Sequence, residues 1–244
     1  MMAWYEEAFR ADYLRVYPHR DDAAAAAEVA AWVGRLPGLA AGGAVLDLAC
    51  GAGRHLRALA AAGLVATGCD LSRDLLAEAR RPGSPPVVRA DMRRLPFLRA
   101  SFDAVTSFFS SFGYFPDESA DAAVLGEAAC VLRPGGSLLL DLMDPETVRA
   151  NLVARSERER DGVRTVETRS LVDGGRRVEK TVLLRDGGRD RTWTESVRLY
   201  DPDEVEAMAA AVGLRAAGRH GGHGPCPWRT GETPRCVLLF RRDA

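Results

Sequence analysis

A glycine-rich turn is the feature of this sequence best suited to chemistry. The stretch VLDLACGAGRHL, from Val45 to Leu56, reads as an apolar strand, a turn around Gly51 and Gly53, and the start of a helix. Glycine lets a backbone approach a ligand closely, and a helix N-terminus offers unpaired N–H groups to an anion. A nicotinamide dinucleotide fingerprint would require a third glycine at position 56, where this chain has leucine.

Asp70 supplies the acidic partner of that turn. It closes the second apolar strand, where a carboxylate can accept hydrogen bonds from both hydroxyls of a ribose. The glycine turn together with this acid indicates a ligand that carries a ribose, which neither feature indicates alone. His55 begins the helix after the glycines and is expected to be solvated or to cap that helix.

The elements that position these residues alternate between strands and helices. Two helical stretches are expected first, at about Ala3–Val16 and Asp21–Leu36, separated by Pro18. Short apolar strands separated by helices then predict a parallel sheet covered on both faces, with all strand carboxyl ends at the ligand-binding edge. The expected strands are 44–49, 65–70, 87–90, 102–108 and 137–142, and the expected helices are 54–62, 72–81 and 117–132.

A different pattern follows the fifth strand. The stretches 163–172, 177–184 and 192–200 alternate apolar and polar residues and are joined by two Asp-Gly-Gly turns. This pattern predicts a three-stranded antiparallel meander with one covered face and one wet face. We expect the meander to lie above the site, either as a lid or as a dimer surface. A helix at 201–212 and strands near 214–219 and 236–241 follow it.

Composition disfavours several classes of protein. The 244 residues carry a formal net charge of −1, so no global field attracts nucleic acid or an anionic membrane. Lys180 is the only lysine, and the abundance of arginine makes any single arginine weak evidence of function. The five cysteines show no paired spacing, and no signal peptide or membrane-spanning run is present. A cytoplasmic protein without membrane contact is expected.

Five stretches between Val45 and Asp144 carry a resemblance to a known family: VLDLACGAGRH, VATGCDLS, RADMRRLPF, FDAVTSFFSSFGYF and VLRPGGSLLLDLM. In this order they resemble the motifs of class I S-adenosylmethionine-dependent methyltransferases of the bacterial small-molecule type. The resemblance implies an α/β fold, a Rossmann-like doubly wound sheet of about seven strands with the last strand antiparallel, here with an antiparallel β-meander insertion. It divides the chain into an N-terminal helical cap (1–37), a cofactor-binding core (38–154), the β insertion (155–200), and a C-terminal helix with two strands that complete the sheet (201–244).

The resemblance also implies S-adenosylmethionine as the cofactor and assigns its contacts. Asp70 would bind the ribose, and Leu71 would pack on the adenine. Asp91 would accept a hydrogen bond from the adenine amino group, and Met92 would lie beside it. The remaining implied cofactor residues, which include those around the methionine portion, are Asp47, Ala49, Gly51, Gly53 and Phe108.

The methyl acceptor is expected where three segments meet at the ligand edge of the sheet. The stretch FFSSFGYF after the fourth strand supplies aromatic rings, which suit a cationic sulfonium or amine. The loop His220–Pro234 and the N-terminal stretch Tyr13–Asp21 complete the site. Tyr114 and His223 are the predicted catalytic residues, with His19 an alternative for taking a proton from an amine. The predicted substrate contacts are Tyr13, Tyr17, Phe112, Phe115, Trp228 and Arg229.

No metal is expected in the site. His220, His223 and Cys226 lie close in sequence, but their spacing fits no established zinc site and a fourth ligand is missing. Methyl transfer from a sulfonium needs mainly alignment of the reacting atoms in a dry site.

The expected function is therefore methyl transfer to a nitrogen or oxygen atom of a small molecule, by a monomer or homodimer. A tRNA or protein methyltransferase is the first alternative, with the hairpin arginines within 176–177 and 189–191 as a docking surface. The near-neutral net charge disfavours a nucleic-acid partner. A non-catalytic S-adenosylmethionine-binding protein is the second alternative, and a nicotinamide oxidoreductase, disfavoured by Leu56, is the third.

Overall fold

The computed structural model describes residues 3–17 and 22–243, and its largest part is a seven-stranded sheet. The last strand of the chain runs antiparallel to both its neighbours, whereas the five strands on one side of it pair in parallel. The expected Rossmann-like sheet is thus confirmed. From edge to edge the strands are β10 (Leu214–His220), β11 (Arg235–Arg242), β5 (Leu132–Met143), β4 (Phe102–Ser107), β1 (Ala44–Leu48), β2 (Val65–Asp70) and β3 (Val87–Arg89).

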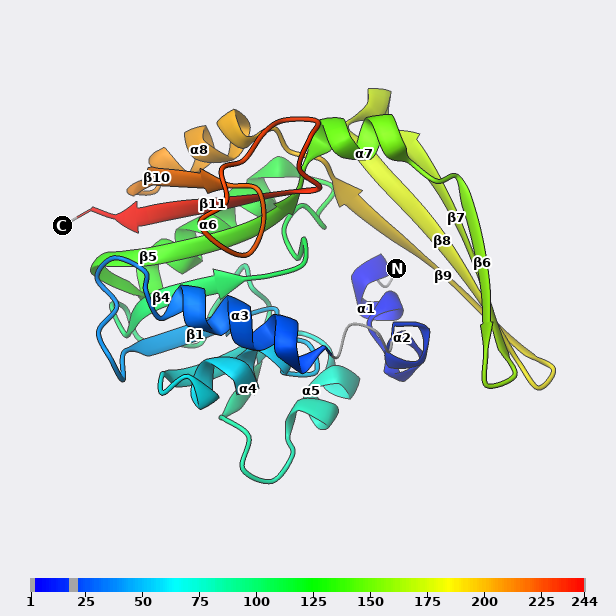
Figure 1. Cartoon of the computed structure of the whole chain (residues 1–244), viewed down its shortest axis with the longest axis horizontal. Coiled ribbons are helices and arrows are strands. Elements are labelled where there is room, and N and C mark those ends of the chain that lie inside the picture. Colours follow the sequence, from blue (N-terminus) through cyan, green and yellow to red (C-terminus); the bar gives the residue numbers. More distant parts are fainter. Residues whose placement is uncertain (1–2, 18–21, 244) are drawn as a thin grey trace.

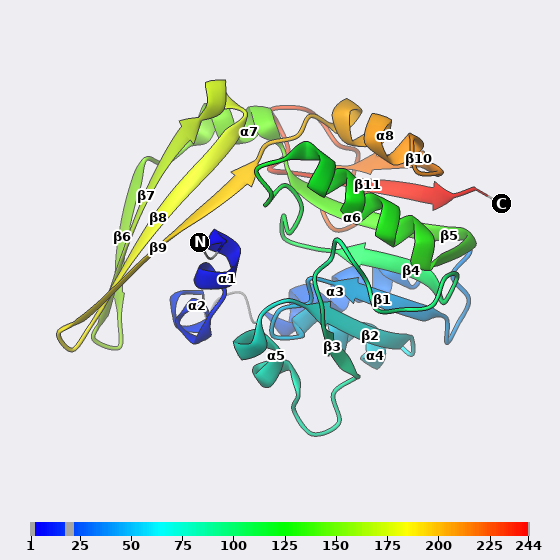
Figure 2. The same cartoon turned by 180° about the vertical axis from the view of Figure 1, so that it is seen from behind.

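Helices cover both faces of this sheet because its strands are apolar on both sides. In β1, Val45 packs against α3 (Ala23–Val33) and α4 (Arg54–Ala61), whereas Leu46 faces the core under α6 (Glu118–Val131) and α8 (Pro202–Ala210). Figures 1 and 2 show these two layers from opposite sides. α5 (Arg73–Ala79) begins at Ser72, whose hydroxyl accepts the Leu75 N–H, as the sequence predicts. In the described part of the chain no helix is both long and apolar enough to cross a membrane.

The N-terminal segment forms two short helices where the sequence predicts one. α1 (Trp4–Ala8) ends at Phe9, and α2 (Ala11–Val16) starts again after Arg10. The break follows from contacts with the core, because the Phe9 carbonyl accepts a hydrogen bond from the Ser72 hydroxyl. The Ala11 N–H donates to the Asp74 carboxylate at 3.1 Å. Pro18 and His19 lie outside the described residues.

The insertion is a four-stranded antiparallel sheet, so the prediction of three strands is wrong. Its order is β6 (Arg155–Arg160), β7 (Val163–Val172), β8 (Arg177–Asp186) and β9 (Arg189–Arg198), and it follows α7 (Pro145–Asn151). The unpredicted strand β6 reads RSERER and is almost wholly exposed, so it lacks the apolar alternation that marks a strand in sequence. Charged residues on an edge strand also discourage pairing with another sheet.

One face of the insertion covers the N-terminal helices, and the other faces solvent (Figure 1). The covered face contributes Val182, Leu184 and Trp193 to a small apolar cluster with α1 and α2. The opposite face carries a row of exposed threonines aligned across β7, β8 and β9: Thr168, Thr181 and Thr194. The expectation of one covered and one wet face is confirmed.

Candidate functional site

The glycine-rich turn lies between β1 and α4, and a hydrogen bond to the Asp70 carboxylate fixes its conformation. Ala49 and Gly51 adopt left-handed φ angles of +59° and +55°. One oxygen of the Asp70 carboxylate accepts the Gly51 N–H, and the other accepts the Ser72 N–H, both at 2.8 Å. Asp70 therefore fixes the turn as well as facing the cavity. Gly53 caps α4 with a φ of +79° and does not line the cavity.

Asp47 is a buried carboxylate with an unmet hydrogen-bonding need. Its side chain is 2 % exposed and lines the cavity. Thr106 contacts one carboxylate oxygen at 3.4 Å, and the other oxygen has no hydrogen-bond partner among the described residues. Burial raises the pKa of the Asp47 carboxyl to about 7. Such a group is suited to receive a cationic ligand.

A second acidic position follows β3. Asp91 accepts hydrogen bonds from the Arg93 guanidinium, with the closest contact at 2.6 Å. This interaction outweighs partial burial and holds the pKa of the Asp91 carboxyl below its ordinary value. Asp91, Met92 and Leu71 all line the cavity near Asp70. Two carboxylates and two apolar side chains at adjacent strand ends suit a nucleoside.

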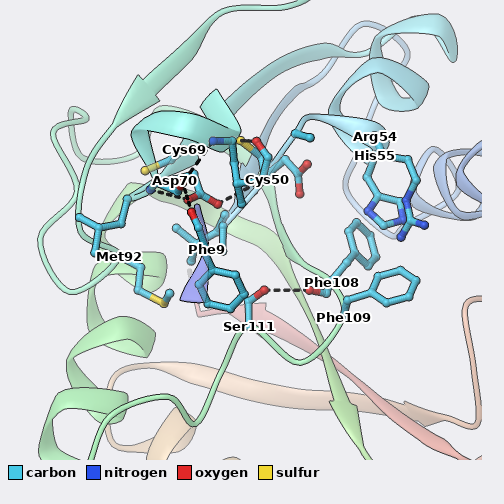
Figure 3. A pocket seen from close by; sticks show the side chains of 18 of the residues that line it. Phe9, Cys50, Arg54, His55, Cys69, Asp70, Met92, Phe108, Phe109 and Ser111 are labelled. Atoms are coloured by element: carbon cyan, nitrogen blue, oxygen red, sulfur yellow. Dashed lines mark hydrogen bonds between the residues drawn. The ribbon is translucent and has the colours of Figure 1, made fainter. Parts of the chain in front are cut away.

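These residues open into a single cavity of about 380 Å³ at the carboxyl ends of the strands. Met92 and Asp70 lie on one side of it, and His55, Phe108 and Phe109 lie on the other (Figure 3). The N-terminal helices close the cavity with Tyr5, Phe9, Tyr13, Leu14 and Tyr17. No described residue of the insertion lines it, so the insertion covers the helical cap rather than the cavity itself.

Aromatic rings dominate the part of the cavity expected to hold the acceptor. Tyr114 and Phe115 both line it, and Tyr114 stacks on Phe9 with ring centroids 5.5 Å apart. The Trp4 indole N–H also donates to the Tyr114 carbonyl at 3.1 Å. Phe112, predicted as a substrate contact, is instead buried in the core against Tyr200 and does not line the cavity.

Tyr17 connects the N-terminal helices α1 and α2, which form the cap over the cavity, to the insertion. Its hydroxyl contacts the carboxylates of Glu167 and Glu195 at 3.1 Å and accepts a hydrogen bond from the Lys180 ammonium at 2.7 Å. Its ring packs against Tyr13, which also lines the cavity. Both predicted substrate tyrosines thus reach the cavity, and Tyr17 also anchors α2 to β7, β8 and β9.

The loop between β10 and β11 lies outside the cavity lining. His223 hydrogen-bonds the buried Asp141 carboxylate at 2.8 Å, behind Phe108 and Phe109. The Trp228 indole donates to the buried Asp144 carboxylate at 2.9 Å. Arg229 is exposed and pairs with Glu232. These predicted substrate and catalytic residues sit apart from the cavity because two carboxylates at the end of β5 hold the loop against the sheet.

His55 is a cavity residue that sequence reasoning placed in solvent or at a cap. It is 8 % exposed, lines the cavity, and packs on Phe108 with centroids 4.5 Å apart. Burial, followed by the neighbouring Arg54 charge, lowers the pKa of the His55 imidazole to about 3, so the ring is neutral at pH 7. The sequence does contain a signal for this position, because Leu59 lies four residues after His55 and therefore on the same face of α4. Leu59 is fully buried, so that face is the apolar one.

The three residues considered for zinc do not converge. His220 packs on Trp32, His223 binds Asp141, and Cys226 is exposed. Within residues 3–17 and 22–243, no three histidine, cysteine or acidic side chains form a group able to hold a metal ion.

Comparison with known proteins places the chain in a family. Residues 45–136 match the family described as "Methyltransferase domain". The chain is 35% identical over 204 residues to the dTDP-3-amino-3,6-dideoxy-alpha-D-glucopyranose N,N-dimethyltransferase of Streptomyces fradiae, a match covering 81% of this chain and 79% of that protein. It is 31% identical over 208 residues to the cypemycin N-terminal methyltransferase of a Streptomyces species, covering 82% of this chain and 84% of that protein.

A solved structure extends the similarity to a cofactor-bound protein. CalS10, an amino pentose methyltransferase from Micromonospora echinaspora with S-adenosylmethionine bound, superposes with a TM-score of 0.67 at 25% identity, covering 94% of this chain and 96% of that one. The chain belongs to the class I S-adenosylmethionine-dependent methyltransferases, and S-adenosylmethionine is its cofactor. The cavity fits this cofactor, because the unpaired Asp47 oxygen suits its ammonium group and Asp70 its ribose.

Proposed function

We propose that this methyltransferase acts on the amine nitrogen of a small molecule, with an amino sugar as the preferred acceptor class. The observation that carries the proposal is the pairing of aromatic rings with a neutral imidazole at one end of the cavity. Rings stabilise a cationic nitrogen or sulfonium, and a neutral imidazole accepts a hydrogen bond from an amine N–H. The names of the two relatives, one acting on an amino sugar and one on an N-terminus, support the same chemistry.

The residues of the chain act mainly by positioning and by excluding water. When bound, S-adenosylmethionine supplies a methyl group carried on a sulfonium. Phe9 and Tyr114 enclose the reacting groups, and the neutral His55 imidazole orients the acceptor by accepting a hydrogen bond from the amine N–H. With the cofactor held beside Asp47 and Asp70, its methyl group would be available to the lone pair of the acceptor nitrogen, the C–S electron pair would remain on sulfur, and the nitrogen would release a proton to solvent. Tyr114 is the proposed catalytic contact, and its hydroxyl fixes the acceptor.

The cap and the insertion form one closing unit in this proposal. Helices α1 and α2 cover the bound ligands, and the insertion holds them through Tyr17 and the apolar cluster around Trp193. The protein is proposed to work in the cytoplasm, supported by its five free cysteines, as a monomer or homodimer and without a nucleic-acid partner. A cavity closed by the cap suits a small acceptor better than a folded polymer.

Mass spectrometry with three acceptors tests the proposal. Purified protein and S-adenosylmethionine are incubated with dTDP-3-amino-3,6-dideoxyglucose, with its 3-hydroxy analogue, and with a tripeptide bearing a free N-terminus. We expect one or two methyl groups on the amino sugar and none on the hydroxy analogue. Methylation of the hydroxy analogue at a similar rate contradicts amine specificity, and methylation of the tripeptide alone contradicts the preference for an amino sugar.

A further inference from the structure

Two consecutive residues at the end of β4 adopt an unusual backbone conformation beside the cavity. Phe109 and Ser110 both have a φ of +58°, in the left-handed region that residues other than glycine rarely occupy. The Ser110 hydroxyl is also buried and lacks a hydrogen-bond partner among the described residues. Such costs persist only where neighbouring groups impose them, and they concentrate at binding sites.

Asp141, at the end of β5, imposes this conformation. Its carboxylate is fully buried and accepts the Phe109 N–H at 2.7 Å, while its carbonyl accepts the Ser110 N–H at 3.0 Å. Arg235 on β11 donates to the same carboxylate at 2.7 Å, and His223 completes the set. Burial opposes ionisation, but Arg235 and His223 hold the pKa of the Asp141 carboxyl below its ordinary value. The Asp141 carboxylate, held in place by these partners, therefore fixes the backbone at Phe109.

With its backbone fixed in this way, Phe109 lines the cavity with its aromatic ring. Phe109 is 37 % exposed, whereas its neighbour Phe108 is 4 % exposed. Among the described residues it is the one exposed large apolar side chain that lines the cavity. The Arg54 guanidinium lies 4.3 Å from its ring centroid, and His55 stacks near it at 5.4 Å with an interplanar angle of 22°. Figure 3 shows Phe109 on the same side as His55.

We propose that Phe109 determines acceptor specificity, and that Asp141 is the positioning residue that holds its ring in the acceptor site. An exposed ring held by a strained backbone gains free energy when an apolar ligand face covers it. The C–H face of a sugar ring beside the reactive amine is such a surface, and His55 lies next to it to receive the amine N–H. This inference rests on the proposed amine acceptor.

Calorimetry on the complex with S-adenosylhomocysteine tests it, with dTDP-3-amino-3,6-dideoxyglucose as the titrated probe. Phe109→Ala is expected to weaken probe binding at least about tenfold, and Phe109→Tyr, which keeps the ring, to restore it to within about threefold. Asp141→Asn is expected to weaken probe binding similarly and to raise the acceptor KM more than it lowers kcat. Affinity for S-adenosylhomocysteine itself is expected to stay within about twofold in all three variants.

Asp144→Asn is the matched control, because Asp144 is an equally buried carboxylate on the same edge that binds Trp228 and not Phe109. It is expected to lower thermal stability as Asp141→Asn does, without weakening probe binding. Unchanged probe affinity in Phe109→Ala refutes the role of Phe109 and leaves the proposed amine acceptor standing. An equal loss of S-adenosylhomocysteine affinity in Phe109→Ala has the same meaning. A comparable loss of probe affinity in Asp144→Asn refutes the role of Asp141. Absence of probe binding to the wild-type complex refutes the preferred acceptor class and this inference with it.

Discussion

Replacing Asp47 with asparagine is expected to make the protein more stable and a weaker binder of its cofactor. Burial raises the pKa of this carboxyl from 3.8 to about 7, because its charged form has too few hydrogen bonds in the fold. The unfolded chain releases the proton near pH 4 and the folded chain near pH 7. Stability therefore falls as pH rises through this window, and the penalty is fully present above pH 7.

The size of the penalty follows from the shift. About three pKa units correspond to on the order of 4 kcal/mol, which is an upper value for the gain of Asp47→Asn at pH 8. Near pH 4 the two proteins are expected to be equally stable. Cofactor affinity is expected to change in the opposite direction, because we propose that the ionised Asp47 pairs with the cofactor ammonium. Losing a charge-assisted hydrogen bond of about 1.5–3 kcal/mol weakens binding roughly ten- to hundredfold at pH 8.

Urea unfolding at pH 4.5 and pH 8, with calorimetry of S-adenosylhomocysteine binding across that range, provides the assay. The wild type is expected to bind more tightly as pH rises through 7 and to release a proton on binding at pH 6, whereas Asp47→Asn shows neither effect. Asp103→Asn is the control, since Asp103 pairs with Arg133 on the surface and its loss is expected to reduce stability at pH 8. A variant Asp47→Asn that is no more stable at pH 8, or that keeps the pH dependence of binding, refutes the reasoning.

Three further predictions concern the acceptor side and the insertion. Tyr114→Phe keeps the ring stack with Phe9 and is expected to lower kcat about tenfold with unchanged cofactor affinity. His223→Ala is expected to raise the acceptor KM without abolishing turnover, because His223 acts through Asp141. Steady-state kinetics in which His223→Ala lowers kcat and Tyr114→Phe leaves it unchanged exclude Tyr114 as the catalytic contact. Turnover is expected to continue in excess chelator, and activity that disappears and returns with zinc would show that a metal is required. Replacing 155–200 with a short linker is expected to leave the seven-stranded sheet folded by circular dichroism and to reduce turnover strongly, because the cap loses the packing of Trp193. Full activity of the shortened protein would remove the insertion from the mechanism, and sedimentation of the wild type separates a lid in a monomer from a dimer surface.

Local sequence patterns were sufficient to predict the parallel sheet and the glycine-rich turn that we propose contacts the cofactor. Apolar runs such as Val45–Leu48 bury themselves whatever their partners are, and the glycines at 51 and 53 permit φ angles that other residues avoid. Asp70 follows from the same local logic, because a residue at the carboxyl end of a parallel strand must lie at the ligand edge. Strand β6 was not predicted, because its sequence RSERER has no apolar face. It forms a strand through its pairing with β7.

Which side chains reach the proposed acceptor side of the cavity depends on tertiary contacts. Phe109, Phe112 and Tyr114 belong to one aromatic stretch, yet Asp141 holds the backbone of the first, Tyr200 packs on the second, and Phe9 stacks on the third. The loop of His223 emerges at the correct edge but is held back by a carboxylate that lies 82 residues earlier in the chain. Contacts of that separation depend on how the whole sheet assembles, and no local pattern encodes them. Local periodicity was therefore sufficient to predict the part of the cavity proposed to bind the cofactor, whereas long-range hydrogen bonds at the end of β5 shape the part proposed to bind the acceptor.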